Sequence, residues 1–470
     1  MPAPSPIQPQ APVSEAALPS LRLALLGAGT VGGALLDLLR SREAEVTCLA
    51  GRPVRAVGIA VRHPAAAAAR GLPAHLLTDA PEALVDDPRV DLVVELMGGE
   101  EPARTLIAAA LKAGKAVVTA NKHVLAHHGA TLEALARETS TPIRFEAAVG
   151  GGIPLLAPLA GGLVGSRIQR LRGIVNGTTN VILTEMRREG RTYADALAQA
   201  QARGYAEADP RGDVAGDDAA NKLVILVRLA FGIWIDPALV SRQPPTVRGW
   251  GEPGITGVAA TEVAAAGRLG LVFRLVAAAR RDESGRVIAS VSPTLVPADS
   301  PLGRTDGVTN RIEVEGDPVG RVAFEGPGAG GPATAAAVLA DLVAIARGGG
   351  STWDPLPAAE PAGEPRPVGA SRGGKGSAGM GEPSQLAGSG PGEGGDPGPS
   401  SWFVFLPANA LAGGGQEPPS RTLAPDRVEA AEGGFALRFD GISLAALRRR
   451  LHEVLRPGVD LPIYPVDGRH

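Results

Sequence analysis

The stretch 21–40, LRLALLGAGTVGGALLDLLR, constrains the fold of this 470-residue chain more than any other part of it. A short apolar run leads into a glycine turn and then into helix-forming residues, as in a strand–turn–helix unit. The turn holds GxGxxG, made by Gly27, Gly29 and Gly32. In such a unit the first glycine permits the turn, the second lets the backbone approach a pyrophosphate, and the third brings helix against strand. The stretch therefore predicts a dinucleotide site, with the phosphates at the helix N-terminus.

The following residues continue the alternation of strands and helices. Apolar runs at 54–61, 91–96 and 116–119 read as strands, and a helix is expected over 102–113. Strands that alternate with helices predict βαβ units and a parallel sheet. We therefore expect an α/β fold that begins with a Rossmann-type dinucleotide-binding domain over 21–145.

A second domain, mixed α/β and bearing substrate and dimer contacts, is expected over 146–325. It has glycine-rich turns, an acidic loop, long helices and strand-like runs near 168–175, 287–296 and 311–325. Residues 326–346 read as a glycine turn that opens an apolar helix, which we expect to return to the nucleotide-binding domain.

The two ends of the chain differ from these domains. Residues 1–20 have neither a basic start nor an apolar run, so they read as a disordered tail and not as a signal peptide. Residues 347–400 are dominated by Gly, Pro, Ser and Glu, which predicts a flexible linker. Order returns over 401–470, where a small strand–strand–helix–strand module is expected.

Composition excludes several classes of protein. The net charge of −3 and the lack of a basic, aromatic patch argue against a nucleic-acid partner. No stretch approaches the roughly 18 consecutive apolar residues of a membrane span. The single cysteine, Cys48, rules out a disulfide framework within the chain and fits a reducing compartment. A cytoplasmic location is expected.

The end of the second predicted strand bears on the form of the cofactor. An acid at this point commonly binds the ribose 2′-hydroxyl of NAD, whereas an arginine accommodates a 2′-phosphate. The sequence has Arg62 and His63 here and no acid. This favours NADP(H) with NAD(H) still possible, unless Arg62 is merely a solvated charge.

Lysine is rare in this chain, which has 46 basic residues. Because arginine does not give up its proton, a lysine retained in such a chain suggests a position that needs a titratable amine, although chance retention is the alternative. The lysines are Lys112, Lys115, Lys122, Lys222 and Lys375.

One lysine, Lys222, follows an acidic loop within 204–226. Asp218 and Lys222 are four residues apart and share a helical face. An acid-held lysine suits hydride transfer, because it can give a proton to the developing alkoxide. The alternative is an exposed ion pair beside a solvated loop. The spacing of the acids does not match a calcium loop. The acids are Glu207, Asp209, Asp213, Asp217 and Asp218.

Two further segments carry polar side chains. In NGTTN (176–180), Thr178 and Thr179 would lie at a helix start and could hold a carboxylate, or could simply cap the helix. Lys122 lies just past a strand's carboxyl end, where open α/β sheets bind their ligands. His123 and His127 are spaced for a shared metal, but no Glu follows the first of them, so a helix surface is the better interpretation.

These residues resemble homoserine dehydrogenases, and the resemblance spans about residues 21–346. Its most specific stretches are GIVNGTTNVILTEM and GYAEADPRGDVAGDDAANKL. The matching stretches are GAGTVG (27–32), TANK (119–122), EAAVGGGIP (146–154), GIVNGTTNVILTEM (173–186), GYAEADPRGDVAGDDAANKL (204–223) and GPGAGGPATAAAV (326–338).

The resemblance implies NAD(P)H-dependent reduction of L-aspartate 4-semialdehyde to L-homoserine, in threonine and methionine biosynthesis, by a homodimer. It makes Lys222 the proton donor and Asp218 its supporting acid. It places Lys122 between nicotinamide and substrate, where Lys122 is an alternative acid/base. Substrate contacts are expected from Glu207, Thr178, Tyr205 and Asp213. Cofactor contacts are expected from Gly27, Gly29, Thr30, Val31, Gly32, Arg62 and Lys122. A monovalent cation, Na⁺ or K⁺, is expected on main-chain oxygens of Glu146, Val149, Gly151 and Ile153.

One departure and two alternatives remain. Many bacterial relatives end in a threonine-sensing ACT domain, whose glycine/proline signature is not recognised in 401–470, so this module reads at most as a diverged regulator. An aldehyde-oxidising relative would need a cysteine nucleophile, and Cys48 lies in the nucleotide half. A non-catalytic nicotinamide-binding sensor would not need both lysines and their acids.

Overall fold

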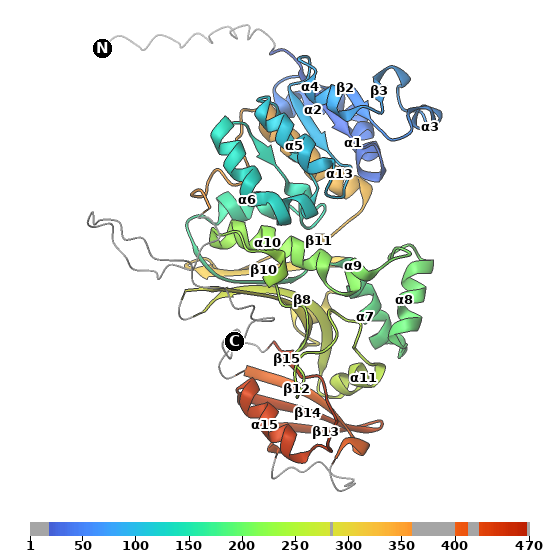
Figure 1. Ribbon diagram of the computed structural model, residues 1–470, viewed down its shortest axis with the longest axis vertical. Helices are drawn as coiled ribbons and strands as arrows, with labels where there is room; N and C mark the ends of the chain where they lie inside the picture. Colours follow the sequence, from blue (N-terminus) through green and yellow to red (C-terminus); the bar gives the residue numbers. More distant parts are fainter. Residues whose placement is uncertain (1–17, 283–284, 360–399, 412–422, 468–470) are drawn as a thin grey trace, which may run out of the picture.

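The computed structural model describes residues 18–282, 285–359, 400–411 and 423–467. The chain forms an elongated molecule with the nucleotide-binding domain at one end, a large mixed sheet in the middle and the C-terminal module at the other end (Figure 1). Residues 1–17 of the expected tail and most of the expected linker lie outside the described residues.

The first domain is built on a six-stranded parallel sheet of order β3-β2-β1-β4-β5-β6. β4 and β5 are buried along their whole length, because helices cover both faces of a sheet made by βαβ crossovers. The Rossmann-type α/β fold is therefore confirmed. The strands are β1 (Leu21–Leu26), β2 (Val54–Ala60), β3 (Leu77–Thr78), β4 (Leu92–Glu95), β5 (Ala116–Thr119) and β6 (Ile143–Arg144).

The helices of this domain include one from far along the chain. α13 (Gly331–Ala346) lies against α1 and shares an apolar core with β1, so residues that follow the second domain complete the first (Figure 1). The other helices are α1 (Thr30–Ser41), α2 (Glu43–Ala50), α3 (Pro64–Ala69), α4 (Pro81–Asp86), α5 (Ala103–Lys112) and α6 (Lys122–Thr139).

The second sheet has nine strands in the order β11-β10-β7-β8-β9-β15-β12-β14-β13. The apolar run near 311–325 is a hairpin of two strands and not one strand. β8 was not expected, because its sequence LVFRLVAAARR is buried at most positions and lacks the alternation of a half-exposed strand. The strands of the middle domain are β7 (Arg167–Ile174), β8 (Leu271–Arg281), β9 (Val287–Pro297), β10 (Thr309–Asp317) and β11 (Gly320–Pro327).

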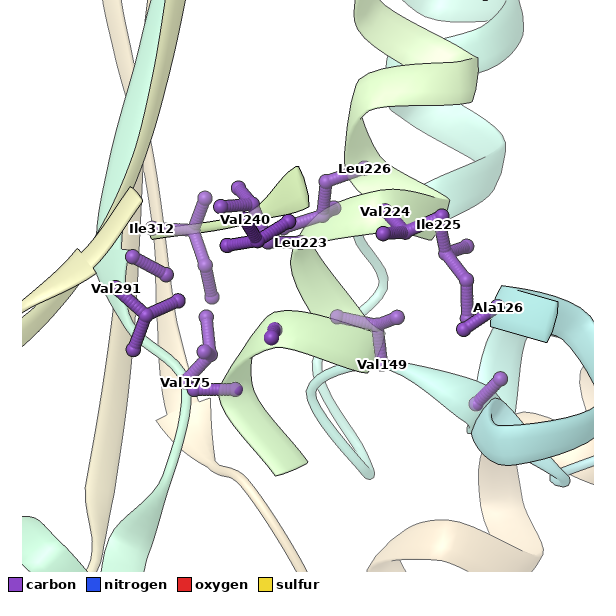
Figure 2. Close-up of a cluster of buried hydrophobic side chains, with 14 of the residues drawn as sticks. Ala126, Val149, Val175, Leu223, Val224, Ile225, Leu226, Val240, Val291 and Ile312 are labelled. Carbon is purple, nitrogen blue, oxygen red and sulfur yellow. The ribbon is translucent and has the colours of Figure 1, made fainter. Parts of the chain in front are cut away.

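One helix of the middle domain, α10 (Asp217–Phe231), lies between the second sheet and the nucleotide-binding domain (Figure 1). Figure 2 shows its apolar residues between Val175, Val291 and Ile312 on one side and Ala126 on the other. This position carries the start of α10 to the boundary of the domains. The other helices are α7 (Gly177–Glu189), α8 (Tyr193–Ala202), α9 (Arg211–Val214), α11 (Ala260–Arg268) and α12 (Pro301–Arg304).

The C-terminal module has one strand more than expected and continues the sheet of the middle domain. β15 pairs with β9 through Val466 and Leu295, and Asp467 forms ion pairs with Arg170 and Arg172 of β7. The module therefore packs on the middle domain. Its elements are β12 (Ser400–Pro407), β13 (Arg427–Ala431), β14 (Gly434–Ile442), α15 (Leu444–Val454) and β15 (Tyr464–Val466).

The beginning of the expected linker is packed structure. Trp353 is fully buried and its ring lies 5.0 Å from that of Phe145 and 6.4 Å from that of Trp234. Composition averaged over 347–400 hid this short segment, because a single buried tryptophan changes the average little. Among the described helices, none has both the length and the apolar character of a membrane span.

Candidate active site

The glycine turn after β1 has the geometry that a dinucleotide needs. Gly27 has φ +97°, and a Cβ there would lie 2.8 Å from the main-chain oxygen of Leu96. A Cβ on Gly32 would lie 2.2 Å from the oxygen of Gly27. Both positions therefore exclude a side chain, the first for the turn and the second for the packing of α1 against β1.

The N-terminus of α1 is open. Gly29 precedes the helix without a side-chain cap, Gly29 and Thr30 are exposed, and a Cβ on Gly29 would meet nothing within 4 Å. α13 begins beside it, since a Cβ on Gly331 would lie 2.9 Å from Thr30. Free N–H groups at an exposed helix start suit a pyrophosphate. The residues present therefore fit a dinucleotide, with Val31 in the first turn.

Arg62 lies two residues beyond β2 at this same edge of the sheet. Its side chain is exposed, and it forms no ion pair with any residue in the described parts of the chain. The guanidinium is therefore free to meet a ligand at the strand's end.

Lys222 and Asp218 lie on the first two turns of α10. The Lys222 ammonium donates to Asp218 Oδ2 at 2.7 Å and to the main-chain oxygen of Val175 at 2.7 Å. The other carboxylate oxygen, Oδ1, lies 3.1 Å from Nζ of Lys122, the first residue of α6. The structure thus places both lysines on one carboxylate, at the boundary between the domains.

Charge and burial shift two pKa values in this cluster. Burial alone would raise the pKa of Asp218, but the two ammonium groups and hydrogen bonds from Lys222 and Asn176 hold it well below its usual range. The Asp218 carboxylate raises the pKa of Lys122, and Asp213 and Glu207 add to this effect against the opposing effect of burial. The site therefore holds Asp218 as a carboxylate near neutral pH, with the ammonium of Lys122 beside it.

Sequence analysis did not single out Asn176, which organises the acids. Its amide nitrogen donates to Asp213 Oδ1 at 2.7 Å and to Asp218 Oδ2 at 2.8 Å. Its Oδ1 caps α7 by accepting from the main chain and hydroxyl of Thr179, both at 2.9 Å. The available signal was its type, because asparagine is a favoured N-cap residue and it stands between a strand and a helix.

The remaining expected substrate residues lie further out. Thr178 donates to the main-chain oxygen of Tyr205 at 2.8 Å, which ties the start of α7 to the acidic loop. Tyr205 and Glu207 are exposed. Asp217, another acid of this loop, is the first residue of α10 and pairs with Arg242 at 2.9 Å.

A further buried residue that sequence analysis did not single out, the carboxylate of Glu95, lies at the end of β4. Glu95 accepts from the Thr119 hydroxyl at 2.6 Å and from the main chain of Met97 at 2.8 Å. Asn121 donates to the main-chain oxygen of Gly99 at 2.8 Å and caps α6. These contacts fix the loops after β4 and β5, from which Lys122 projects.

The loop expected to bind a cation lies against the segment that leads to α13. The Glu146 carboxylate accepts from the main chains of Leu155, Leu156 and Ala157 at 2.6–2.8 Å, which closes the loop. Val149, Gly151 and Ile153 are buried, and their main-chain oxygens accept no hydrogen bond from any described residue. Buried oxygens left without a donor fit a monovalent cation.

The histidines of α6 contact an acid. His128 Nε2 lies 2.7 Å and His123 Nε2 3.5 Å from the Glu100 carboxylate. Among the described residues, no group of three or more His, Cys, Asp or Glu side chains is arranged to hold a metal ion.

Comparison with known proteins agrees with this geometry. The family model for the homoserine dehydrogenase NAD-binding domain matches residues 27–146, and that for homoserine dehydrogenase matches residues 154–343. A homoserine dehydrogenase of Synechocystis sp. is 43% identical over 329 residues, which are 69% of this chain and 73% of the relative.

Solved structures show the same relationship. A homoserine dehydrogenase from Thiobacillus denitrificans has a TM-score of 0.77 and 34% identity, and the match covers 95% of this chain and 98% of that one. A hyperthermophilic archaeal homoserine dehydrogenase in complex with NADPH has a TM-score of 0.57 and 28% identity, over 69% and 97% of the two chains. These matches do not favour a non-catalytic sensor. The chain belongs to the homoserine dehydrogenase family of NAD(P)-dependent oxidoreductases, which act on a CH–OH group.

Proposed function

We propose that this chain reduces L-aspartate 4-semialdehyde to L-homoserine with NADPH, and that Lys222 supplies the proton. The observation that carries the proposal is the placement of Lys222, Asp218 and Lys122 together beside the carboxyl ends of the parallel strands. A bound reduced nicotinamide would supply the hydride. The protein must then supply orientation, a proton and stabilisation of the developing alkoxide.

Lys222 is arranged for this role. An ammonium group has three donors, and the side chain of Asp218 and the main chain of Val175 take two of them. The third remains for a substrate oxygen. Because its two partners belong to its own domain, Lys222 keeps this direction without help from the cofactor domain. Lys122 would lie between the nicotinamide and the substrate.

The acids and the start of α7 suit an amino-acid substrate. Asp213 and the exposed Glu207 offer carboxylates to the substrate ammonium, and the first turn of α7 at Thr178 offers N–H groups to its carboxylate. Tyr205, tied to Thr178, would close the site on its solvent side.

Three finer assignments belong to the same proposal. Arg62, which is exposed and forms no ion pair among the described residues, supports NADP(H) over NAD(H). The buried main-chain oxygens of Val149, Gly151 and Ile153, with that of Glu146, would hold Na⁺ or K⁺ next to the segment that leads to α13. A cytoplasmic homodimer that serves threonine and methionine synthesis is expected from the family. The C-terminal module, tied to β7 by Asp467, would act as a regulator.

The test is oxidation of NADPH and NADH by the purified protein with L-aspartate 4-semialdehyde, in KCl and in choline chloride at equal ionic strength. We expect turnover, faster with NADPH and faster with K⁺. Binding of NADPH without turnover would overturn the catalytic proposal. Equal rates in the two salts would contradict the proposed role of a monovalent cation. Sedimentation of the same sample tests the dimer, and added threonine tests the regulatory module.

A further inference from the structure

The two helices that bring the lysines together contact each other at two places. At the first place, Lys122 at the start of α6 faces Asp218 at the start of α10. At the second, Glu133 of α6 pairs with Arg228 of α10. The interval is eleven residues on α6 and ten on α10, or roughly 16 Å and 15 Å at 1.5 Å per residue. The helices therefore run in the same direction with matched spacing between the two contacts.

The second contact is a fully buried ion pair. The Arg228 guanidinium donates through Nε to Glu133 Oε2 at 2.8 Å and through Nη2 to Oε1 at 2.6 Å. The indole of Trp234 donates to Oε2 at 2.8 Å. The Arg228 side chain is 0% exposed and that of Glu133 is 3% exposed. A bidentate pair of this kind fixes direction as well as distance.

Between the two contacts α6 packs on α10 and on Trp234, which follows α10. A Cβ on Gly129 would lie 2.2 Å from the ring of Trp234, so α6 can accept this tryptophan only at a glycine. Figure 2 shows Ala126 of α6 beside Ile225 of α10 and Val149. The side chains that meet between the contacts are apolar and buried, and such surroundings strengthen the ion pair at their end.

The packed segment 350–359, here called the strap, closes the second contact. Its Thr352 donates through the main chain to Ile143 of the nucleotide-binding domain at 3.1 Å. The oxygen of Pro357 accepts from Arg228 at 2.8 Å, and that of Leu356 accepts from Arg137 of α6 at 3.1 Å. The strap thus binds both domains beside the Glu133–Arg228 pair.

We propose that Glu133 and Arg228, held by the strap, are positioning residues that set Lys122 against Asp218. Lys222 reaches Asp218 within one helix, so its position needs no domain contact. Lys122 belongs to the other domain, and the described ion pairs give its ammonium only Asp218 as a partner. A small rotation of α6 on α10 would therefore separate Lys122 from Asp218 while Lys222 stays in place.

The experiment compares the two lysines in one sample. Because the chain has five lysines, ¹³C-lysine labelling gives a spectrum simple enough to assign with Lys122→Arg and Lys222→Arg. In Glu133→Gln we expect the pKa of Lys122 to fall, because its ammonium moves away from Asp218, Asp213 and Glu207. The ammonium of Lys222 has both of its partners in its own domain and should keep its place, so its signal should change less than that of Lys122. We also expect kcat to fall roughly 10²-fold through misplacement of Lys122.

Two further variants decide the result. Glu313→Gln is the matched control, because it removes a carboxylate that is equally buried and is paired with Arg172 at 2.9 Å. This pair lies inside the middle domain, so the titration of Lys122 should be the same as in the parent protein.

If Glu133→Gln does not fold, Glu133→Leu combined with Arg228→Met removes both charges without leaving one unpaired, and the same change at Lys122 is expected. An unchanged pKa of Lys122 in a folded variant, or equal changes at both lysines, would overturn the proposal. The effect on kcat rests on the lysine roles proposed above, whereas the titration of Lys122 does not.

Discussion

Asp218 and Lys122 form a 3.1 Å ion pair across the boundary between the two domains. The carboxylate belongs to the helix that lies on the large sheet, and the ammonium belongs to the helix that follows the last long strand of the parallel sheet. Neither domain alone contains this arrangement. The site therefore depends on how the domains pack as well as on the residues that each supplies.

The proposed role of Lys222 as the proton donor predicts a specific kinetic effect. Lys222→Ala should lower kcat by roughly 10²–10⁴-fold with little change in NADPH affinity, because it removes a proton donor that touches the substrate and not the cofactor. Steady-state oxidation of NADPH and fluorescence titration of the cofactor measure the two quantities. Lys112→Ala, which removes an exposed lysine of α5, is the matched control and should leave both unchanged. Near-parental turnover in Lys222→Ala would show that Lys222 is not the proton donor and would leave Lys122 as the candidate.

The exposed Arg62 predicts a change of cofactor preference. Arg62→Asp should weaken NADPH more than NADH, because a carboxylate repels the 2′-phosphate and accepts from a free 2′-hydroxyl. The ratio of kcat/KM for the two cofactors is the measurement. Arg70→Asp makes the same charge change just after α3, at another exposed arginine, and should not alter the ratio. If both variants lose the two cofactors equally, Arg62 does not contact the phosphate.

The nucleotide-binding fold could be predicted because its signals are local. Gly27 and Gly32 are required by contacts with residues close in sequence or on the adjacent strand, and the apolar runs of β4 and β5 show that both faces are covered. Asp218 and Lys222 could be paired for the same reason, since four residues make one helical turn. In each case the period of the secondary structure supplies the geometry.

The features that sequence analysis did not predict depend on contacts between residues far apart in the chain. The Glu133–Arg228 pair spans 95 residues, and the strap reaches the same place through more than a hundred more. No periodicity connects Trp353 to Phe145, or β15 to β9. Asn176 had a local signal as a cap, but its hold on Asp213 and Asp218 arises only when the start of α7 meets α9 and the start of α10.

Glu262 of α11 predicts a pH dependence of stability. It is buried, and its Oε2 accepts from the Tyr464 hydroxyl of β15 at 2.9 Å and from the main chain of Ala259 at 2.9 Å. Burial raises the pKa of Glu262 to about 7, against the lowering effect of these hydrogen bonds. Among the described groups, no cation pairs with this carboxylate. Its ionisation is therefore costly in the folded protein.

The sign follows from the raised pKa. A carboxyl that binds its proton more tightly when folded contributes stability that is fully present below its ordinary pKa and is lost as the pH rises through about 7. A shift from 4.5 to about 7 corresponds to at most about 3 kcal/mol. Glu262→Gln should match the parent in Tm at pH 5 and exceed it at pH 8. Equal pH dependence of Tm in the two proteins would show that Glu262 stays ionised when folded.

Asn176 predicts a loss of activity beyond the loss of a helix cap. Asn176→Ala removes the cap of α7, which costs about 1 kcal/mol of stability, and also frees Asp213 and Asp218 from their shared donor. We expect kcat to fall roughly 10–10²-fold, because the acid that holds both lysines is no longer fixed. Thr192→Ala is the matched control, since Thr192 caps α8 through its side chain by accepting from Asp195 at 3.2 Å and, in the described structure, forms no hydrogen bond with Asp213 or Asp218. Both variants should lose similar stability in thermal unfolding, and only Asn176→Ala should lose turnover. A fall in kcat of the same size in Thr192→Ala would mean that helix capping, and not the hold on the acids, explains the effect.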